Sequence, residues 1–257
     1  MNQNQTGAGH FVNFVLLKEA AWNKEEFMKI LKEEWQIEAE DNGDEKKKQT
    51  DQDEDAVCFY SQDCMISAAL MPTPIPDGEA EYHAGRNYMW QDAEETVKQH
   101  QGHLMVIVMN LGAGAVEAGK LLTKVVSSCC KQAGVLGVYA NETVYQPEQY
   151  LQFADMLKES RFPIFNLVWF GLYPGKDGIC SCTCGMNKFG YDEMEIIDSN
   201  AQPSQILDFL SGVAAYVIVE GVVLQSGETI GFSAEQQISI TKSQGIAVEG
   251  ESLKLGF

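Results

Sequence analysis

Apolar and polar residues alternate along the first hundred positions in a pattern that predicts strands and helices in turn. Residues 11–17 (FVNFVLL) are strand-like, and residues 24–35 place apolar side chains at helical spacing. Two short apolar runs, 57–60 and 65–70, predict a pair of strands that end before the prolines of 72–76. We therefore expect a strand, an amphipathic helix and two further strands.

A second helix is predicted over 79–100, and residues 103–109 (HLMVIVM) are apolar on both alternating faces, which predicts a buried central strand. The order strand, helix, two strands, helix, strand is that of a ferredoxin-like βαββαβ half. We therefore expect an α+β protein whose residues 1–110 form such a half.

Residues 111–257 repeat this order more loosely, as a second α+β half that is either separate or continuous with the first. Ser226-Gly227 and Gln244-Gly245 supply turn residues for hairpins near the end. The predicted elements are helices over 116–133, 147–160 and 203–220, a strand over 135–140 and mainly strands within 166–183.

The charge of the chain narrows the possible partners. With 37 Asp and Glu against 18 Lys and Arg, the formal net charge is −19, which repels phosphate backbones and anionic lipids. No apolar run approaches the length of a membrane span. The pattern therefore argues against nucleic acid and membrane, and it is compatible with a basic protein partner or with acidity that serves solubility alone.

Two further features concern the environment of the protein. The segment 38–55 (EAEDNGDEKKKQTDQDED) has almost no apolar residue and predicts a mobile acidic surface insertion. Seven cysteines are an odd number, and Met1–His10 shows no basic-then-apolar leader. We expect a reduced, cytoplasmic protein, whose oligomeric state the sequence does not reveal.

The stretch Gly114–Lys120 most resembles a catalytic motif. It satisfies the first seven positions of G-x-x-x-x-G-K-[ST], with Gly114, Gly119 and Lys120 as the candidate phosphate ligands. Leu121, however, replaces the hydroxyl that would hold Mg²⁺, and Glu117 places a carboxylate where phosphate would bind. An ordinary strand-to-helix turn is the competing interpretation, in which the helix turns Lys120, Lys124, Ser127 and Lys131 away from its apolar face, toward solvent.

Cys180, Cys182 and Cys184 alternate along a predicted strand, which suggests a thiolate metal site. Alternate strand residues lie roughly 6.5 to 7 Å apart, so a regular strand cannot chelate one ion with all three thiols. The alternative is packing of small buried residues beneath a helix.

His83, Arg86 and Trp90 would share one face of the predicted helix 79–100 and form the first candidate for a polar pocket. A packed helix with a salt bridge is the structural alternative. No nucleophile elbow, zinc-protease helix or Ser/His/Asp arrangement is recognisable, so the sequence favours a non-catalytic protein and predicts no cofactor.

Several segments resemble a bacterial family known as domain of unknown function 4261. They are residues 169–173 (WFGLY), 183–190 (TCGMNKFG), 193–196 (EMEI) and 227–232 (GETIGF), with Asp208-Phe209 and Tyr216 between them. The resemblance is clearest over the last third of the chain and supplies no catalytic or binding residue. By architectural analogy with immunity domains, it is compatible with a protein that neutralises a basic toxin.

Overall fold

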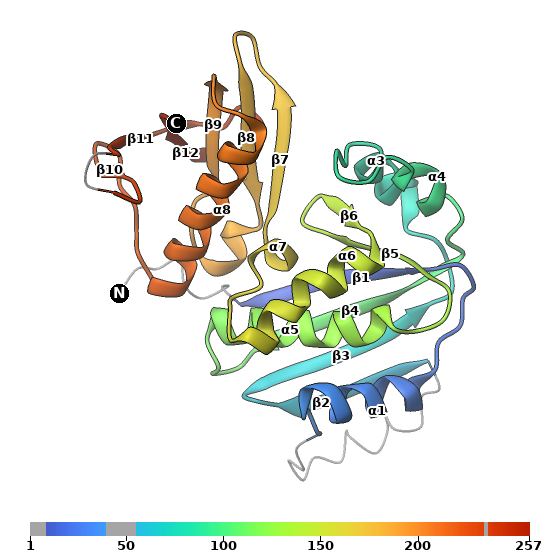
Figure 1. Ribbon diagram of the computed structural model, residues 1–257. Helices are drawn as coiled ribbons and strands as arrows, with labels where there is room; N and C mark the ends of the chain where they lie inside the picture. Colours follow the sequence, from blue (N-terminus) through green and yellow to red (C-terminus); the bar gives the residue numbers. More distant parts are fainter. Residues whose placement is uncertain (1–8, 40–54, 234–235) are drawn as a thin grey trace. The chain divides into compact units, whose positions relative to one another are not determined.

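The structure, a computed structural model, describes residues 9–39, 55–233 and 236–257 (Figure 1). Most of the acidic segment predicted over 38–55 thus lies outside the described residues. The chain divides after Asn166 into two compact units, which we call the N-terminal unit and the C-terminal unit. Each unit has its own six-stranded sheet with helices, so the predicted α+β class is confirmed.

The sheet of the N-terminal unit has the order β2-β3-β4-β1-β5-β6, and all neighbouring strands are antiparallel. Its strands are β1 (His10–Leu17), β2 (Ala56–Ser61), β3 (Cys64–Met71), β4 (Gly102–Asn110), β5 (Val135–Ala140) and β6 (Thr143–Tyr145). β4 lies between β3 and β1, as expected for a strand that is apolar on both faces.

This strand order differs from the predicted ferredoxin-like half. That fold is built from split βαβ motifs, in which another strand separates the two parallel strands of each motif. Here β3 and β4 are direct antiparallel neighbours, paired from Cys64 with Asn110 through Met71 with His103. β5 and β6 then continue the same sheet beyond β1, and for this reason the division falls after Asn166 rather than near residue 110.

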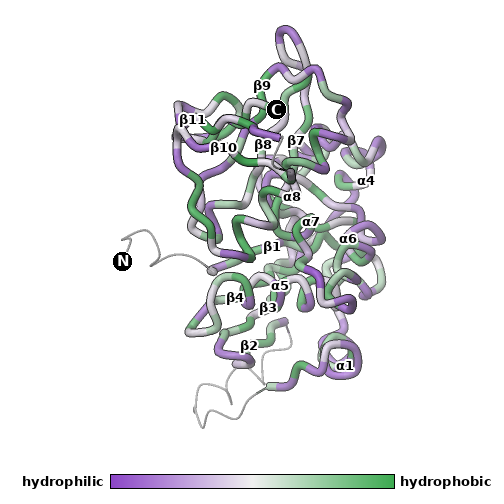
Figure 2. Tube along the Cα trace, turned by 60° about the vertical axis from the view of Figure 1, so that its left-hand side comes forward, coloured by the Kyte–Doolittle hydropathy of each residue, from purple (hydrophilic) through white to green (hydrophobic). Residues whose placement is uncertain are grey.

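Helices accompany both faces of this sheet. Phe14 and Leu16 of β1 pack with residues of 75–97 on one face, so the alternate β1 side chains point to the other. α5 (Ala115–Cys130) contacts β1, β4 and β5, while α1 (Lys24–Trp35) and α6 (Pro147–Ala154) contact α5. α1 is largely hydrophilic along its length in Figure 2 and buries Phe27 and Leu31. The shorter helices are η2 (Pro76–Gly78), α3 (Glu79–Ala84), α4 (Ala93–Val97), η3 (Asp155–Glu159) and α7 (Ile164–Leu167).

The sheet of the C-terminal unit has the order β10-β11-β12-β9-β8-β7, in which β12 and β9 are parallel. Its strands are β7 (Trp169–Pro174), β8 (Ile179–Cys184), β9 (Met194–Ser199), β10 (Thr229–Ile230), β11 (Ile238–Gln244) and β12 (Glu251–Leu255), and a short helix, η4 (Met186–Phe189), precedes β9.

The long helix α8 (Pro203–Glu220) packs on β7, β8 and β9. It begins with a capping box formed by Gln202 and Gln205, and it ends at Gly221, whose φ of 69° is left-handed. Among the described residues, no helix combines the length and the apolar character needed to cross a membrane.

Candidate functional site

The predicted pocket residues His83, Arg86 and Trp90 fall in a segment that leaves the sheet after β3 and returns at β4. The expected helix over 79–100 is interrupted: α3 ends at Ala84, and α4 does not begin until Ala93. Asn87 lies between the two helices, where its Nδ2 donates to the Val144 carbonyl at 2.7 Å. Arg86 and Trp90 therefore do not share a helix face with His83, because this tertiary hydrogen bond holds the chain in a turn.

Small and apolar side chains seat the segment on the sheet. Ala80, Ala84, Ala93 and Val97 are each at most 1% exposed and pack with Leu16, Tyr139 and Val144. His100 anchors the far end: its Nε2 accepts from the Ile75 backbone N–H at 2.9 Å, so its Nδ1 carries the proton donated to the Val97 carbonyl. The segment is thus fixed at both ends by buried side chains.

His83 belongs to a stack of rings rather than to an open pocket. Its ring stacks on Tyr139 with centroids 5.5 Å apart, and Tyr139 stacks in turn on Phe14 at 5.9 Å. The Tyr139 hydroxyl donates to Glu79 Oε1 at 2.6 Å. Burial, and next this carboxylate, raise the pKa of Tyr139, so the phenol stays protonated and acts as a donor.

Beside this stack, the same segment presents large side chains to solvent. Tyr82 is 56% exposed, and Tyr88 and Met89 are each 42% exposed. The Arg86 guanidinium lies 4.5 Å from the centroid of the Tyr82 ring, within cation–π range. We call Tyr82, Arg86, Tyr88 and Met89 the aromatic segment.

Some polar groups of the Gly114–Lys120 turn are already engaged in contacts within the protein. Asn110 Oδ1 accepts from the backbone amides of both Gly112 and Gly114, at 3.1 and 3.0 Å. The Lys120 ammonium pairs with Glu117 at 2.7 Å. These contacts use an amide and the ammonium that would bind phosphate, so the geometry favours a structural turn with Gly114 in a left-handed conformation (φ 84°).

The face of α5 that was expected to be solvated is more enclosed than its sequence indicates. Ser127 is 1% exposed, and burial lowers the pKa of Lys124. α1 and α6, which both contact α5, account for this enclosure. Burial also raises the pKa of Cys129 and Cys130, as expected for core thiols.

The three alternating cysteines lie on β8, which pairs with β7 along its whole length. Cys180 and Cys182 are buried, and Cys180, Cys182 and Cys184 form no disulfide within the described residues. Across the described ranges, no three His, Cys, Asp or Glu side chains are grouped as a metal ion would require. Cys180 instead accepts from the Asp198 backbone N–H at 3.2 Å.

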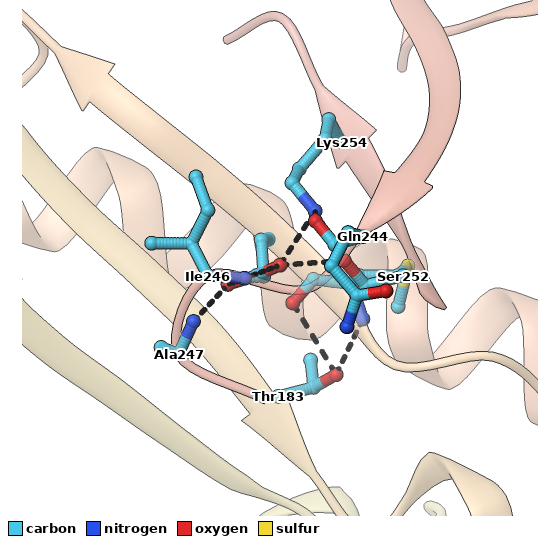
Figure 3. Close-up of polar contacts among 8 residues, drawn as sticks. Thr183, Gln244, Ile246, Ala247, Ser252 and Lys254 are labelled. Atoms are coloured by element: carbon cyan, nitrogen blue, oxygen red, sulfur yellow. Dashed lines mark hydrogen bonds and ion pairs between the residues drawn. The ribbon is translucent and has the colours of Figure 1, made fainter. Parts of the chain in front are cut away.

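Two glutamates that sequence reasoning did not propose as site residues, Glu193 and Glu195, organise the C-terminal unit. Figure 3 shows Ile246, Ala247, Ser252 and Lys254, the residues that donate to the Glu195 carboxylate. Glu195 is 0% exposed, yet its carboxylate accepts from the amides of Ile246 and Ala247, the Ser252 hydroxyl and the Lys254 ammonium. Burial alone would raise its pKa, but Lys254 and these other donors outweigh burial and lower it. The available signal was a charged residue between the apolar residues Met194 and Ile196.

Glu193 secures the neighbouring turn. Its carboxylate accepts from the Thr183 hydroxyl at 2.6 Å and from the amides of Gly185 and Asn187 at 2.9 and 3.2 Å. Burial nevertheless raises the pKa of Glu193. The two carboxylates therefore hold the segments on either side of β9, the η4 turn and the β11–β12 loop.

A pocket of about 420 Å³ opens between the η4 turn, the end of α8 and the side chains of Lys242 and Leu253. Met186, Phe189 and Met194 are buried residues in its wall. At its polar side, Asp192 Oδ2 pairs with the Lys242 ammonium at 2.7 Å.

These features define a two-unit α+β protein with an exposed aromatic segment in one unit and a preformed pocket in the other. Residues 182–256 match the family described as Domain of unknown function (DUF4261), which confirms the resemblance over the C-terminal third. No curated protein and no solved structure gives a match to this chain. The matched region contains Glu193, Glu195 and all the described residues that line the pocket.

Proposed function

We propose that this protein is a non-catalytic binding protein whose N-terminal unit docks on a protein with a basic surface. The observation that carries the proposal is the aromatic segment, in which three large apolar side chains and an arginine are exposed within residues 82–89. Tyr, Met and Arg are enriched at protein interfaces, and Tyr and Arg are common among the residues that dominate binding energy.

Charge around the aromatic segment indicates the kind of partner. Residues 76–98 contain six carboxylates, at 77, 79, 81, 92, 94 and 95, against Arg86 and Lys98. Lys98 is itself paired with Glu94 at 2.6 Å. An apolar centre flanked by carboxylates complements a partner with an apolar patch surrounded by lysines and arginines.

The aromatic segment is also held in place before any partner arrives. Asn87 fixes its middle through Val144, and the Met89 amide donates to Asn87 Oδ1 at 2.8 Å. Arg86 and Tyr82 restrain each other through their ring contact. Because fewer side chains and backbone angles must be ordered on binding, more of the interaction free energy contributes to affinity.

An immunity protein that binds and neutralises a basic toxin is the form of this function that we would test first. The proposal places the protein in the cytoplasm, where the seven cysteines, which form no disulfide within the described residues, remain reduced. Catalysis is not part of the proposal, since the side chains at the Gly114 turn and on β9 are engaged in structural contacts.

The test is a quantitative affinity purification at native expression level, with the full chain as bait. We expect a stoichiometric basic protein that is retained by wild type and reduced about tenfold by the double substitution Tyr82→Ala and Arg86→Ala, since truncating two central anchors costs at least 1.4 kcal/mol. Raising the salt concentration should accelerate its release.

The matched control is Tyr216→Ala in the C-terminal unit, where Tyr216 is 47% exposed. This substitution should leave the yield of the partner unchanged. Recovery of no partner, or equal recovery by wild type and the double variant, would refute docking through the aromatic segment.

A further inference from the structure

We infer that the pocket of the C-terminal unit binds a positively charged group carried on an apolar stem, such as an alkylammonium. The inference does not rest on the proposed function, because it concerns the other unit and other residues. The wall of the pocket combines the η4 turn, the end of α8 and side chains of β11 and β12.

The apolar part of the site is built before any ligand enters. Met186 and Met194 are at most 1% exposed, Val217 is 3% and Leu253 is 5% exposed. Together with Phe189 they form a wall that accommodates methylene groups, with thioethers that adapt to irregular shapes. A volume of about 420 Å³ suits a small ligand rather than a whole peptide.

The polar part of the site favours a cation over an anion. Lys242 is the one basic side chain among the described residues of the pocket wall. It lies 2.7 Å from Asp192, which lines the pocket, and 3.9 Å from Glu251, which does not, so two carboxylates offset the charge of one ammonium. These carboxylates raise the pKa of Lys242, Asp192 first through its hydrogen bond.

The end of α8 adds to the negative potential. Val217 and Gly221 line the pocket, so the carboxyl end of this 18-residue helix faces it. All residues of α8 are among the described residues. Its last turn carries no basic residue and ends in Glu220. An uncompensated helix C-terminus attracts cations.

Asp192 can receive the ligand without losing its own partner. Lys242 Nζ contacts Oδ2, and a carboxylate can accept further hydrogen bonds, so an incoming ammonium can bind Asp192 while this contact is kept. The Asp192 side chain is 39% exposed and therefore reachable from solvent. The nearby rings of Phe189 and Tyr191 provide further favourable surfaces for a cation.

Three probes with one stem separate the contributions of shape and charge. Hexylammonium, hexanol and hexanoate share a six-carbon chain and differ in the charge of the head group. In NMR titrations of the full chain, we expect hexylammonium to bind about fivefold more tightly than hexanol, the effect of one partly exposed ion pair. Hexanoate should bind more weakly than hexanol.

Two substitutions should move hexylammonium affinity in opposite directions. Asp192→Asn removes the acceptor charge and should weaken binding about fivefold, whereas Lys242→Met removes the competing cation and should strengthen it. Asp177→Asn and Lys176→Met are the matched controls, because both side chains are at least 74% exposed on the β7–β8 turn of the same unit. These controls should bind like wild type.

Equal affinity for hexylammonium and hexanol would overturn the inference, and so would tightest binding of hexanoate with loss of that binding in Lys242→Met. A fourth probe, N-acetyl-lysine N-methylamide, distinguishes a protein side chain from a free amine as the source of the cation. It carries the ammonium on a peptide backbone. Binding of this probe identifies a protein side chain as the ligand, while its exclusion alongside hexylammonium binding identifies a free amine.

Discussion

Glu195 and Lys254 form a buried ion pair across the parallel strands β9 and β12, with Lys254 Nζ 2.7 Å from Glu195 Oε2. The two residues are also partners in the strand register. The pair joins β9, which follows the η4 turn, to β12, the last strand. The Glu195 carboxylate also accepts from the amides of Ile246 and Ala247 in the loop between β11 and β12. One carboxylate therefore links β9, β12 and the loop between β11 and β12.

Glu195→Gln should destabilise the protein by about 3 kcal/mol, because removing one partner leaves the Lys254 ammonium in a site that is 16% exposed without its counter-charge. Urea denaturation followed by fluorescence would measure this change. The double substitution Glu195→Gln with Lys254→Met should cost less than the sum of the single substitutions. Additive costs would show that the two charges are not coupled.

The pH dependence of stability should carry a contribution from His103. Its Nδ1 contacts the Thr73 carbonyl at 3.0 Å, its ring packs against Phe14, and burial lowers its pKa. In the unfolded state, His103 binds a proton as pH falls through its ordinary pKa near 6.5. In the folded state, its lowered pKa means that it does not yet bind that proton. The free energy of unfolding should fall as pH drops from about 7 to 5.

Substituting His103→Gln should reduce this slope, while His10→Gln at an exposed position of β1 should leave it unchanged. The measurement is urea denaturation at pH 7.5 and 5.5. A slope unaffected by His103→Gln would contradict the prediction.

Glu193 should act with the opposite sign. Burial raises its pKa, so the folded state holds a proton more tightly than the unfolded state. This contribution to stability is present below the ordinary carboxyl pKa and is lost as pH rises through the raised value. Glu193→Gln keeps an acceptor for the Gly185 and Asn187 amides but cannot titrate. It should therefore remove the loss of stability that occurs as pH rises. Denaturation from pH 4 to 7 tests it, and an unchanged profile would contradict it.

ATP and GTP with Mg²⁺ should not stabilise the protein. The Gly114 amide is bonded to Asn110 and the Lys120 ammonium to Glu117, so binding phosphate would first have to break both contacts. A bound nucleotide at a hundredfold its Kd would add about 2.7 kcal/mol to stability, which thermal-shift measurement detects readily. A shift that Lys120→Met abolishes would restore the phosphate-loop interpretation.

Freshly purified protein should contain zinc and copper well below one ion per chain. Cys180, Cys182 and Cys184 lie on a strand that is paired throughout with β7, and alternate residues on such a strand are roughly 6.5 to 7 Å apart. Elemental analysis measures the metal content. One equivalent of metal in wild type that is absent from Cys182→Ser would establish the thiolate site.

The sequence by itself determined the elements whose pattern is local. Helical spacing located α1 and α8 at the residues where they occur, and the apolar run 103–109 identified β4 as a central strand. Such patterns are readable because side chains three or four apart share a helix face and alternate residues share a strand face.

Only the tertiary structure decided the strand order, the break between α3 and α4 and the partners of the buried carboxylates. Asn87 interrupts the expected helix by reaching Val144, 57 residues away, and Glu195 finds its donors 51 to 59 residues further along the chain. The apolar pattern shows that a side chain is buried, but it does not show which distant polar groups satisfy a buried carboxylate. That choice depends on the global packing of the sheets, because each such hydrogen bond exists only when distant strands are already in register.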